Sequence, residues 1–576
     1  MIDKYYEEEL RYLYESGREF AKAHPDRAAY LNIDAVGDRD PSVERLFEGF
    51  AFLTARIRET IDDTFPELTE GLIQLLWPQF LQEIPSTAIV EFSPRQGHLQ
   101  KSHRLPRGSQ VLSKPVGNPG VACPFTTTHD LILNPLVISA VAYTADRQGG
   151  SALSLTLTFE DGVMASACTL DTLRIFLHAE MPIALMLHEF LTSQVTGVTI
   201  TDVASGTTTA VQDPCPVTPA GLTAAETLLP LDARAFHGYS LLLEYFVCPE
   251  KFLFVDLHGL AAFATAFPGL HEVRYTISFA QALPPEKPIS AEMFRLHCTP
   301  VINLFSSEIE PLTRDSRQRS YPLFSGTAGY PHSIQSVTGI DLTSGVRRPY
   351  ESIFTFKNLG HAGGPVYIPQ YRLAPSGRRE LAIGFAGGTI LSGGEETISL
   401  EARCHNGSLP RDELREGDIK FTSPAMPDFI KLVNITRPTP IGAMPVASDY
   451  QWIFLAHQGI TISSLANADS LRAFLRLYDR SGSEGTAQRI VAISEVSCSA
   501  AHRIHDAMLI HGSEFTVTFS ERGTIDPCEL RLLGLVLSEF LTQFAAINSF
   551  VELTFILKPS GATMHWVAHK GIQCPL

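Results

Sequence analysis

The sequence lacks paired cysteines and an apolar leader. Nine cysteines are scattered from Cys123 to Cys574 in 576 residues, and no Cys-x-x-Cys pair occurs. An odd, dispersed set is typical of reduced thiols and argues against a disulfide framework. The first eight residues, MIDKYYEE, are polar, so we expect no signal peptide. These features predict a protein of the reducing cytoplasm.

Long uninterrupted apolar runs are also missing. The most apolar stretches, residues 246–267 and 530–557, contain charged and amide side chains such as Asp256 and Glu539. A bilayer-spanning segment would have to bury these groups at high cost. The sequence therefore predicts no direct membrane insertion.

Basic residues are fewer than acidic residues. The chain has 45 Lys and Arg residues against 62 Asp and Glu residues, which gives a formal net charge of −17. An acidic body repels nucleic acid and anionic membrane surfaces, so neither is expected as a main partner. Hydrophobic residues make up 44% and charged residues 19%, as in a globular protein. At this length roughly three to four domains are expected.

The chain opens with helical patterns. Apolar residues recur at helical spacing up to Pro25, which predicts a first helix. Asp40 can cap a second helix, and Pro41 suits its first position. A third helix is predicted to follow Pro66 and to end before Pro85.

The second helix has an apolar seam. Its positions alternate steps of three and four: Val43, Leu46, Phe50, Leu53 and Ile57. This spacing is typical of a coiled coil or a helical bundle. Two interpretations remain open, because a few heptads do not decide between them. Either the three helices close a bundle among themselves, or the seam packs on helices of another chain.

From residue 88 onward the pattern alternates and is broken by turn residues, which predicts strands. The expected strands are residues 88–92, 131–143, 153–159, 173–177, 240–247, 272–279, 350–356, 381–385 and 397–402. A helix is expected at residues 183–195, and residues 204–225 are expected to form an exposed loop. Proline clusters at residues 284–288 and 424–445 predict linkers.

The last segment mixes helices and strands. Asp526 and Glu529 have the spacing of a capping box around Pro527, which predicts an amphipathic helix. A further helix is expected at residues 470–477, and strands at 490–496, 514–519 and 550–557.

We therefore predict an α+β, multidomain fold. Its parts are an N-terminal helical segment (1–85), a β-rich middle domain (86–285), a second β-rich domain (286–445) and a mixed α/β C-terminal domain (446–576).

The local cluster of metal-ligating side chains comprises Cys498, His502, His505 and His511. Tetrahedral zinc needs four ligands, and His502-x-x-His505 could supply two from one helical face. The flanking residues instead predict a strand that leads into a loop, and a fourth ligand is not evident. We favour residues without a ligand role and predict no metal and no cofactor.

Other motifs resemble functional sites only in part. His565 and His569 have the spacing of a helical two-histidine site but lack the glutamate base, and Gly561 and Gly571 favour a strand or loop. The glycines at 384–388 and 393–394 lead into a strand-like segment without Gly-Lys-Ser/Thr, so tight turns are favoured over a phosphate loop.

Signatures of catalysis are missing too. No Gly-x-Ser-x-Gly nucleophile elbow occurs. The adjacent carboxylates Asp62-Asp63 and Glu395-Glu396 point away from each other and are interpreted as solvated surface. One sequence does not show whether distant residues assemble a site. We predict no catalytic residues and no enzyme.

Several segments resemble one protein family, in the family's order along the chain. They are residues 12–21 with His24-Pro25, 40–53 (DPSVERLFEGFAFL), 55–57, 62–68 (DDTFPEL), 228–230, 238–239, 244–246, 249–252, 303–305, 437–440 and 547–550. These segments resemble the TssF family, also called VasA or ImpG, of bacterial type VI secretion. The resemblance runs nearly from end to end.

The resemblance implies a structural wedge subunit of the cytoplasmic baseplate, which docks to the inner-membrane complex and supports sheath and tube polymerisation. It implies TssG, a second copy of TssF, TssK, TssE and the VgrG spike as partners. From the seam and this role we expect a partner interface at Val43, Leu46, Phe50, Leu53 and Ile57. The alternatives are a wedge protein of another contractile phage-tail-like system, and an enzyme with a dispersed site.

Overall fold

The computed structural model describes most of the chain, in two compact units. The described residues are 2–23, 41–117, 120–145, 149–230, 236–284, 289–315, 318–326, 329–341, 345–354, 364–373, 378–386, 396–444, 462–505, 508–521, 526–545 and 549–571. One unit comprises Met1–Leu76 with Ala447–Gln458, and the other Trp77–Val446 with Gly459–Leu576. In the described ranges, no helix has both the length and the apolarity that a membrane span requires.

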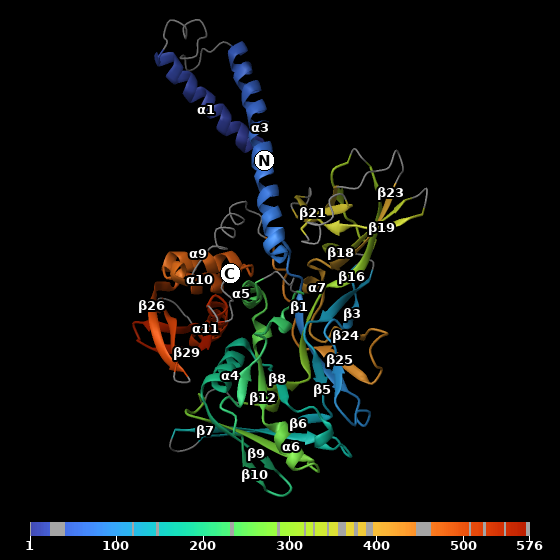
Figure 1. Ribbon diagram of the computed structural model, residues 1–576, viewed down its shortest axis with the longest axis vertical. Coiled ribbons are helices and arrows are strands. Elements are labelled where there is room, and N and C mark those ends of the chain that lie inside the picture. The colour runs from blue at the N-terminus through green and yellow to red at the C-terminus, as the bar shows by residue number, and fades with distance from the viewer. Residues whose placement is uncertain are drawn as a thin grey trace. The chain divides into compact units, whose positions relative to one another are not determined.

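Among the described residues, the first unit contains the helices α1 (Ile2–Ala23) and α3 (Pro41–Leu76), drawn in blue in Figure 1. The prediction of a separate third helix is wrong, because α3 continues through Pro66 to Leu76. A proline removes one main-chain donor and disfavours a helix, but the hydrogen-bond ladder of this 36-residue helix extends on both sides. The predicted cap Asp40 lies outside the described residues.

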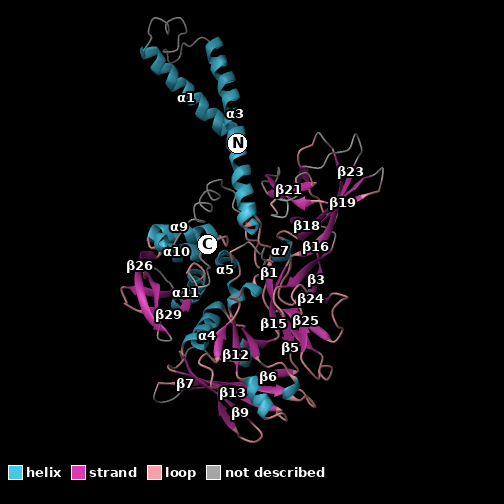
Figure 2. Ribbon diagram, in the orientation of Figure 1, coloured by secondary structure: helices cyan, strands magenta, loops and turns pink. Residues whose placement is uncertain are grey.

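The second unit is rich in strands (Figure 2) and contains a six-stranded sheet in the order β24-β3-β4-β15-β1-β25. Its strands are β1 (Thr87–Pro94), β3 (Gln110–Val116), β4 (Val121–Thr127), β15 (Cys298–Ile302), β24 (Ile419–Thr422) and β25 (Ile430–Asn434). Strand β1, next to the edge strand β25, pairs antiparallel with β15 and with β25. The sheet thus joins strands from early and late parts of the chain, and β25 lies within the proline-rich stretch 424–445.

Two more sheets come from the middle of the chain. The five-stranded sheet has the order β10-β9-β13-β7-β6, and a four-stranded sheet the order β11-β12-β8-β14. Their strands are β6 (Leu136–Ala145), β7 (Ser151–Phe159), β8 (Thr172–Leu177), β9 (Val195–Asp202), β10 (Thr208–Ala210), β11 (Val217–Pro219), β12 (Phe254–His258), β13 (Glu272–Phe279) and β14 (Phe294–Leu296). A small ribbon pairs β2 (His103–Leu105) with β5 (Leu131–Leu133).

Helices accompany these sheets: α4 (Met181–Ser193), α5 (His237–Val247) and α6 (Leu260–Ala266). The predicted helix at 183–195 is confirmed by α4. The predicted strand at 240–247 is wrong, because these residues form most of α5. Every residue of that run is buried, and an apolar run buried on all sides does not reveal by periodicity whether it is helix or strand.

The next segment forms two facing four-stranded sheets around one apolar core. Their strands are β16 (Phe305–Arg314), β17 (Tyr321–Pro322), β18 (Tyr330–Asp341), β19 (Arg347–Pro349), β20 (Glu351–Ser352), β21 (Val366–Leu373), β22 (Arg379–Ala386) and β23 (Glu396–His405). The predicted strands at 381–385 and 397–402 are confirmed. Only β20 forms in the predicted strand 350–356, whose last two residues lie outside the described ranges. The short helix α7 (Leu409–Glu413) follows.

The C-terminal segment packs helices on a sheet of order β26-β27-β28-β29. Its elements are α9 (Ala468–Tyr478), α10 (Glu484–Val491), β26 (Ile493–His505), β27 (Met508–Ser520), α11 (Pro527–Thr542), β28 (Ser549–Lys558) and β29 (Thr563–Lys570). Asp526 caps α11 as predicted, accepting the Cys528 N–H at 2.9 Å. The predicted strand 490–496 is corrected at its start, since α10 extends to Val491. The α+β fold class is confirmed.

Aromatic rings join distant segments of the second unit. Tyr239 of α5 stacks on Tyr478 of α9, with ring centroids 5.6 Å apart and planes 8° apart. The Trp77 ring lies 5.6 Å from Tyr239, and the Phe540 ring of α11 lies 6.0 Å from it. A Cβ at Gly238 would come within 2.9 Å of the Phe540 ring. The Gly238-Tyr239 pair is therefore explained by packing.

Buried histidines make the second unit sensitive to acid. His188 on α4 is 3% exposed, and its Nε2 has no hydrogen-bond partner among the described residues. Burial lowers the pKa of His188 to about 4. Burial likewise lowers the pKa values of His297 and His332 to about 4. All three are therefore neutral in the folded chain at neutral pH.

We expect His188→Leu to reduce this acid sensitivity. The pKa of a histidine is about 6.5 in the unfolded chain, so His188 takes up a proton on unfolding below that pH. Its contribution to stability is therefore complete above pH 6.5 and is lost as the pH falls toward 4. In urea unfolding, the loss of unfolding free energy between pH 7.5 and 5.5 should be smaller in the variant by about 1.4 kcal/mol.

The matched control for this measurement is His98→Gln, which replaces an exposed histidine. It should leave the loss between the two pH values unchanged. Equal losses in both variants would contradict the role given to His188.

Candidate partner interface

One face of α3 packs inside the helical unit. The Phe47 ring lies 5.9 Å from the Tyr14 ring of α1. Ala51 and Ala55, one and two turns further on, are completely buried. Small side chains at a four-residue interval allow two helices to approach closely.

A second face of α3 is apolar and uncovered. With 3.6 residues per turn, positions 46, 50 and 53 share a face that is distinct from the one at Ala51. The exposed fractions are 65% for Leu46, 59% for Phe50 and 61% for Leu53. The neighbouring Phe52 is 45% exposed. No described helix of this unit covers these side chains.

The structure therefore brings three of the five predicted interface residues to one exposed face. Val43 and Ile57 lie on the same helix, but their side chains lie outside the described residues. Binding of a partner to this face remains a prediction.

The histidine cluster near the C-terminus lies on the two paired strands β26 and β27, where the sequence predicted a strand that leads into a loop. His502 of β26 faces His511 of β27, with their Nδ1 atoms 2.8 Å apart. Cys498 is four strand residues away from His502, or roughly 13 Å. The His505 side chain lies outside the described residues. Among the described residues, no three His, Cys, Asp or Glu side chains gather as a metal site.

The second histidine pair lies on a strand, which confirms that prediction. β29 contains His565, whose Nε2 lies 2.5 Å from Glu552 Oε1. The His569 side chain lies outside the described residues. Gly384 lies within β22, and residues 387–395, which hold the other glycines of that motif and Glu395, also lie outside the described ranges.

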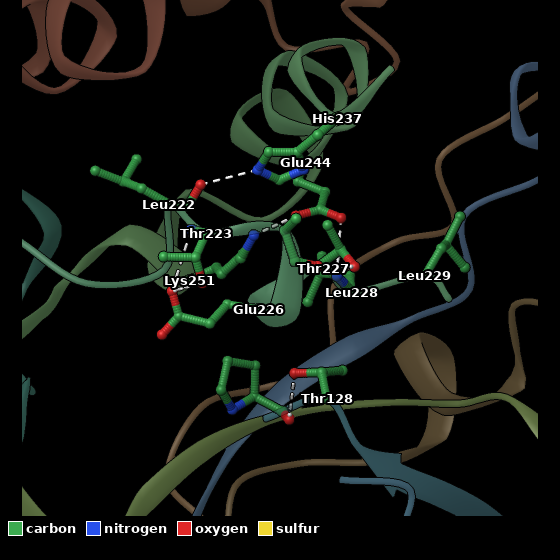
Figure 3. A network of polar contacts seen from close by, with 12 residues as sticks. Thr128, Leu222, Thr223, Glu226, Thr227, Leu228, Leu229, His237, Glu244 and Lys251 are labelled. Atoms are coloured by element: carbon green, nitrogen blue, oxygen red, sulfur yellow. Dashed lines mark hydrogen bonds and ion pairs between the residues drawn. The ribbon is translucent and has the colours of Figure 1, made fainter. Parts of the chain in front are cut away.

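A buried polar network, shown in Figure 3, explains several of the family-like segments. The Lys251 ammonium forms an ion pair with Glu244, and these side chains are 0% and 4% exposed. The second carboxylate oxygen of Glu244 accepts the Leu228 N–H at 2.8 Å. The segments 228–230, 244–246 and 249–252 therefore meet around one buried charge pair.

Single arginines extend this network. Arg107 donates to the carbonyl oxygens of Ala225 and Thr227 at 2.9 and 2.6 Å. Arg174 of β8 donates to both carboxylate oxygens of Asp256 on β12, at 2.8 and 2.7 Å. No short sequence pattern indicates these roles, because the partners of each arginine lie far away along the chain.

Arg174 also lies 2.5 Å from the Glu226 carboxylate. Burial would raise the pKa of Glu226, but the Arg174 charge and hydrogen bonds from Thr223 lower it to about 2. A cavity of about 670 Å³ lies beside these groups. The charges that line it hold strands and loops together.

One face of α3 is apolar and uncovered, and the buried charged groups of the second unit pair with one another. These features are typical of a subunit that assembles with other chains. The whole chain supports a specific assignment. The model of the type VI secretion TssF family matches residues 1–573, so the chain belongs to this family. The resemblance noted in the sequence is confirmed.

Relatives of known role agree in length and fold. The type VI secretion system component TssF1 of Pseudomonas aeruginosa is 27% identical, over 99% of this chain and 98% of that protein. A chain of the solved TssK-TssF-TssG baseplate subcomplex of type VI secretion matches with a TM-score of 0.79 and 29% identity, covering 92% of this chain and 100% of that chain. A chain of a solved type VI secretion baseplate complex matches with a TM-score of 0.63 and 26% identity, over the full length of both.

We expect Lys251→Met to destabilise the second unit strongly. The substitution leaves the buried Glu244 without its counter-charge, which typically costs about 3–5 kcal/mol. The double variant Glu244→Gln/Lys251→Met removes both charges and keeps an acceptor for the Leu228 N–H, so it should recover most of the loss. Urea unfolding measures both.

An exposed ion pair provides the control. Lys558 lies 3.2 Å from Glu495, and both side chains are more than 60% exposed. Lys558→Met should cost less than about 1 kcal/mol. A similar cost for Lys251→Met would refute a structural role of the buried pair.

Proposed function

We propose that this chain is a structural subunit of a type VI secretion baseplate that assembles with TssG and TssK. Its membership of the TssF family over residues 1–573 supports this proposal. The likeness to a chain of a TssK-TssF-TssG subcomplex, at 29% identity and a TM-score of 0.79, supports the choice of partners.

The exposed face of α3 is the proposed contact. Leu46, Phe50 and Leu53, together with Val43 and Ile57, pack against helices of TssG or of a second copy of this chain. Covering one such side chain contributes about 1.5–3 kcal/mol. The heptad spacing of the five positions fits knobs-into-holes packing. The observation that supports this contact is the exposure of three large apolar side chains on one helix face.

The finer parts of the proposal rest on the family. They are a wedge position in the cytoplasm beside the inner-membrane complex, TssE and the VgrG spike as further neighbours, and support of sheath and tube polymerisation. They imply a role without catalysis. A wedge protein of another contractile phage-tail-like system is the alternative, and the genes that adjoin this one would distinguish the two.

We expect Phe50→Asp and Leu53→Asp to abolish co-purification with a TssG chain. Each places a charge where the proposed interface excludes water, which costs several kcal/mol. Co-expression, size-exclusion chromatography and mass determination would test this. The unaltered chain should give a complex of two copies with one TssG, and each variant a folded chain without TssG.

Arg45→Asp is the control, because it also introduces an aspartate on α3 but outside the proposed contact face, and it changes the net charge by −2 rather than −1. It should retain the complex. If Phe50→Asp and Leu53→Asp lose helical circular dichroism as well as the partner, these residues serve the chain's own fold and the interface proposal fails.

A further inference from the structure

Strand β6 is a free edge of the five-stranded sheet. It pairs with β7 on one side, and the sheet ends there. Alternate main-chain groups of an edge strand point away from its neighbour and are available to another strand. Within the described ranges, residues 137–145 make no main-chain hydrogen bond outside the ladder with β7.

The sequence of β6 does little to protect this edge. Its ten residues, LVISAVAYTA, include no charged residue, no proline and no glycine. Natural proteins usually block exposed edges with lysine, proline, strong bulges or very short strands. β6 has one irregularity, between Ile138 and Ala140. The opposite edge of the same sheet, β10, is by contrast only three residues long.

The side chains of β6 are also incompletely covered. Ile138, Val141 and Tyr143 lie opposite Leu157, Leu155 and Leu153 of β7, and so point to the same face of the sheet. The three leucines are at most 1% exposed, whereas their β6 partners are only half-buried. On the other face Val137 is 58% exposed. One more strand would cover both faces at this edge.

An acidic groove adjoins the start of β6. It has a volume of about 840 Å³ and is lined by residues 136–138 of β6 and by β14, the edge strand of a second sheet. Its charged lining residues are four carboxylates and one arginine: Glu91, Glu160, Asp161, Glu292 and Arg295. A basic side chain would complement this groove.

We propose that β6 binds an extended, basic segment of a partner protein as a sixth strand of this sheet. Main-chain hydrogen bonds to β6 provide the affinity, and Lys or Arg side chains that reach the groove provide the selectivity. A second copy of this chain fits less well as the added strand, because its own β6 has no basic side chain that could enter the acidic groove. The proposal does not depend on the identity of the baseplate partners.

A defined peptide tests the proposal on the full chain. The probe is a capped ten-residue peptide that alternates valine with arginine, and fluorescence anisotropy measures its binding at low salt. It should bind saturably and protect from hydrogen exchange those amides of residues 137–145 that point away from β7. The same peptide N-methylated at alternate residues should bind at least tenfold more weakly, because it lacks the main-chain donors for one edge. A peptide with glutamate in place of arginine should also bind at least tenfold more weakly.

Variants locate the site. Ala142→Lys places a charge on the exposed face of β6 and should weaken binding at least tenfold. Thr209→Lys, on the opposite edge at β10, is the matched control and should bind as the unaltered chain does. Glu292→Lys, an exposed acid of the groove, should weaken binding about two- to fivefold, with the difference disappearing at high salt.

Three results would overturn the proposal. The first is strong protection, in the free chain, of those amides of residues 137–145 that point away from β7, which would mean that the edge is already covered. The second is equal binding of the arginine, glutamate and N-methylated peptides. The third is a dimer of the chain that Ala142→Lys dissociates, which would assign the edge to a second copy.

Discussion

The second unit is organised around the stacked rings of Tyr239 and Tyr478. Trp77 enters this cluster from the start of the unit, and Phe540 from its last helix. A buried aromatic ring removes about 150–250 Å² from water, more than most aliphatic side chains. Arg480, two residues after Tyr478, donates to the Gln82 carbonyl at 2.7 Å. Segments that lie about 400 residues or more apart along the chain are thereby held by one core.

The charged residues of this core act on the backbone and on one another. Arg107 binds loop carbonyls, and the Glu244–Lys251 pair fixes the Leu228 amide. Such groups remain buried because irregular segments have no ladder to satisfy their main-chain polar atoms. The same holds beside the cavity of about 670 Å³, where Arg174 pairs with Asp256 and Glu226. The structural role of these buried charges is consistent with membership of the TssF family.

Sequence patterns predicted those features of the fold that depend on residues close together in the chain. The spacing of Leu46, Phe50 and Leu53 identified an apolar helix face, because amphipathic periodicity survives in the sequence whatever the partner is. The α+β class and most strands followed from alternation. The same reasoning failed at residues 240–247, where full burial erases the difference between helix and strand, and at Pro66, where a long helix tolerates one lost hydrogen bond. The Glu244–Lys251 network and the free edge at β6 depend on which distant segments become neighbours in the fold. A short sequence pattern does not contain that information.

The position of β1 between β15 and β25 in the six-stranded sheet has a consequence for biosynthesis. Val90 pairs with Asn434 on one side of β1, and Ile89 with Pro300 on the other. At about 5–20 residues per second, Asn434 is synthesised roughly 20–70 s after Val90. During that time the nascent chain displays a strand that lacks its final neighbour and whose Ile89, Val90 and Phe92 are fully buried in the finished protein. The six-stranded sheet is thus completed on the ribosome only long after its strand β1 has been synthesised.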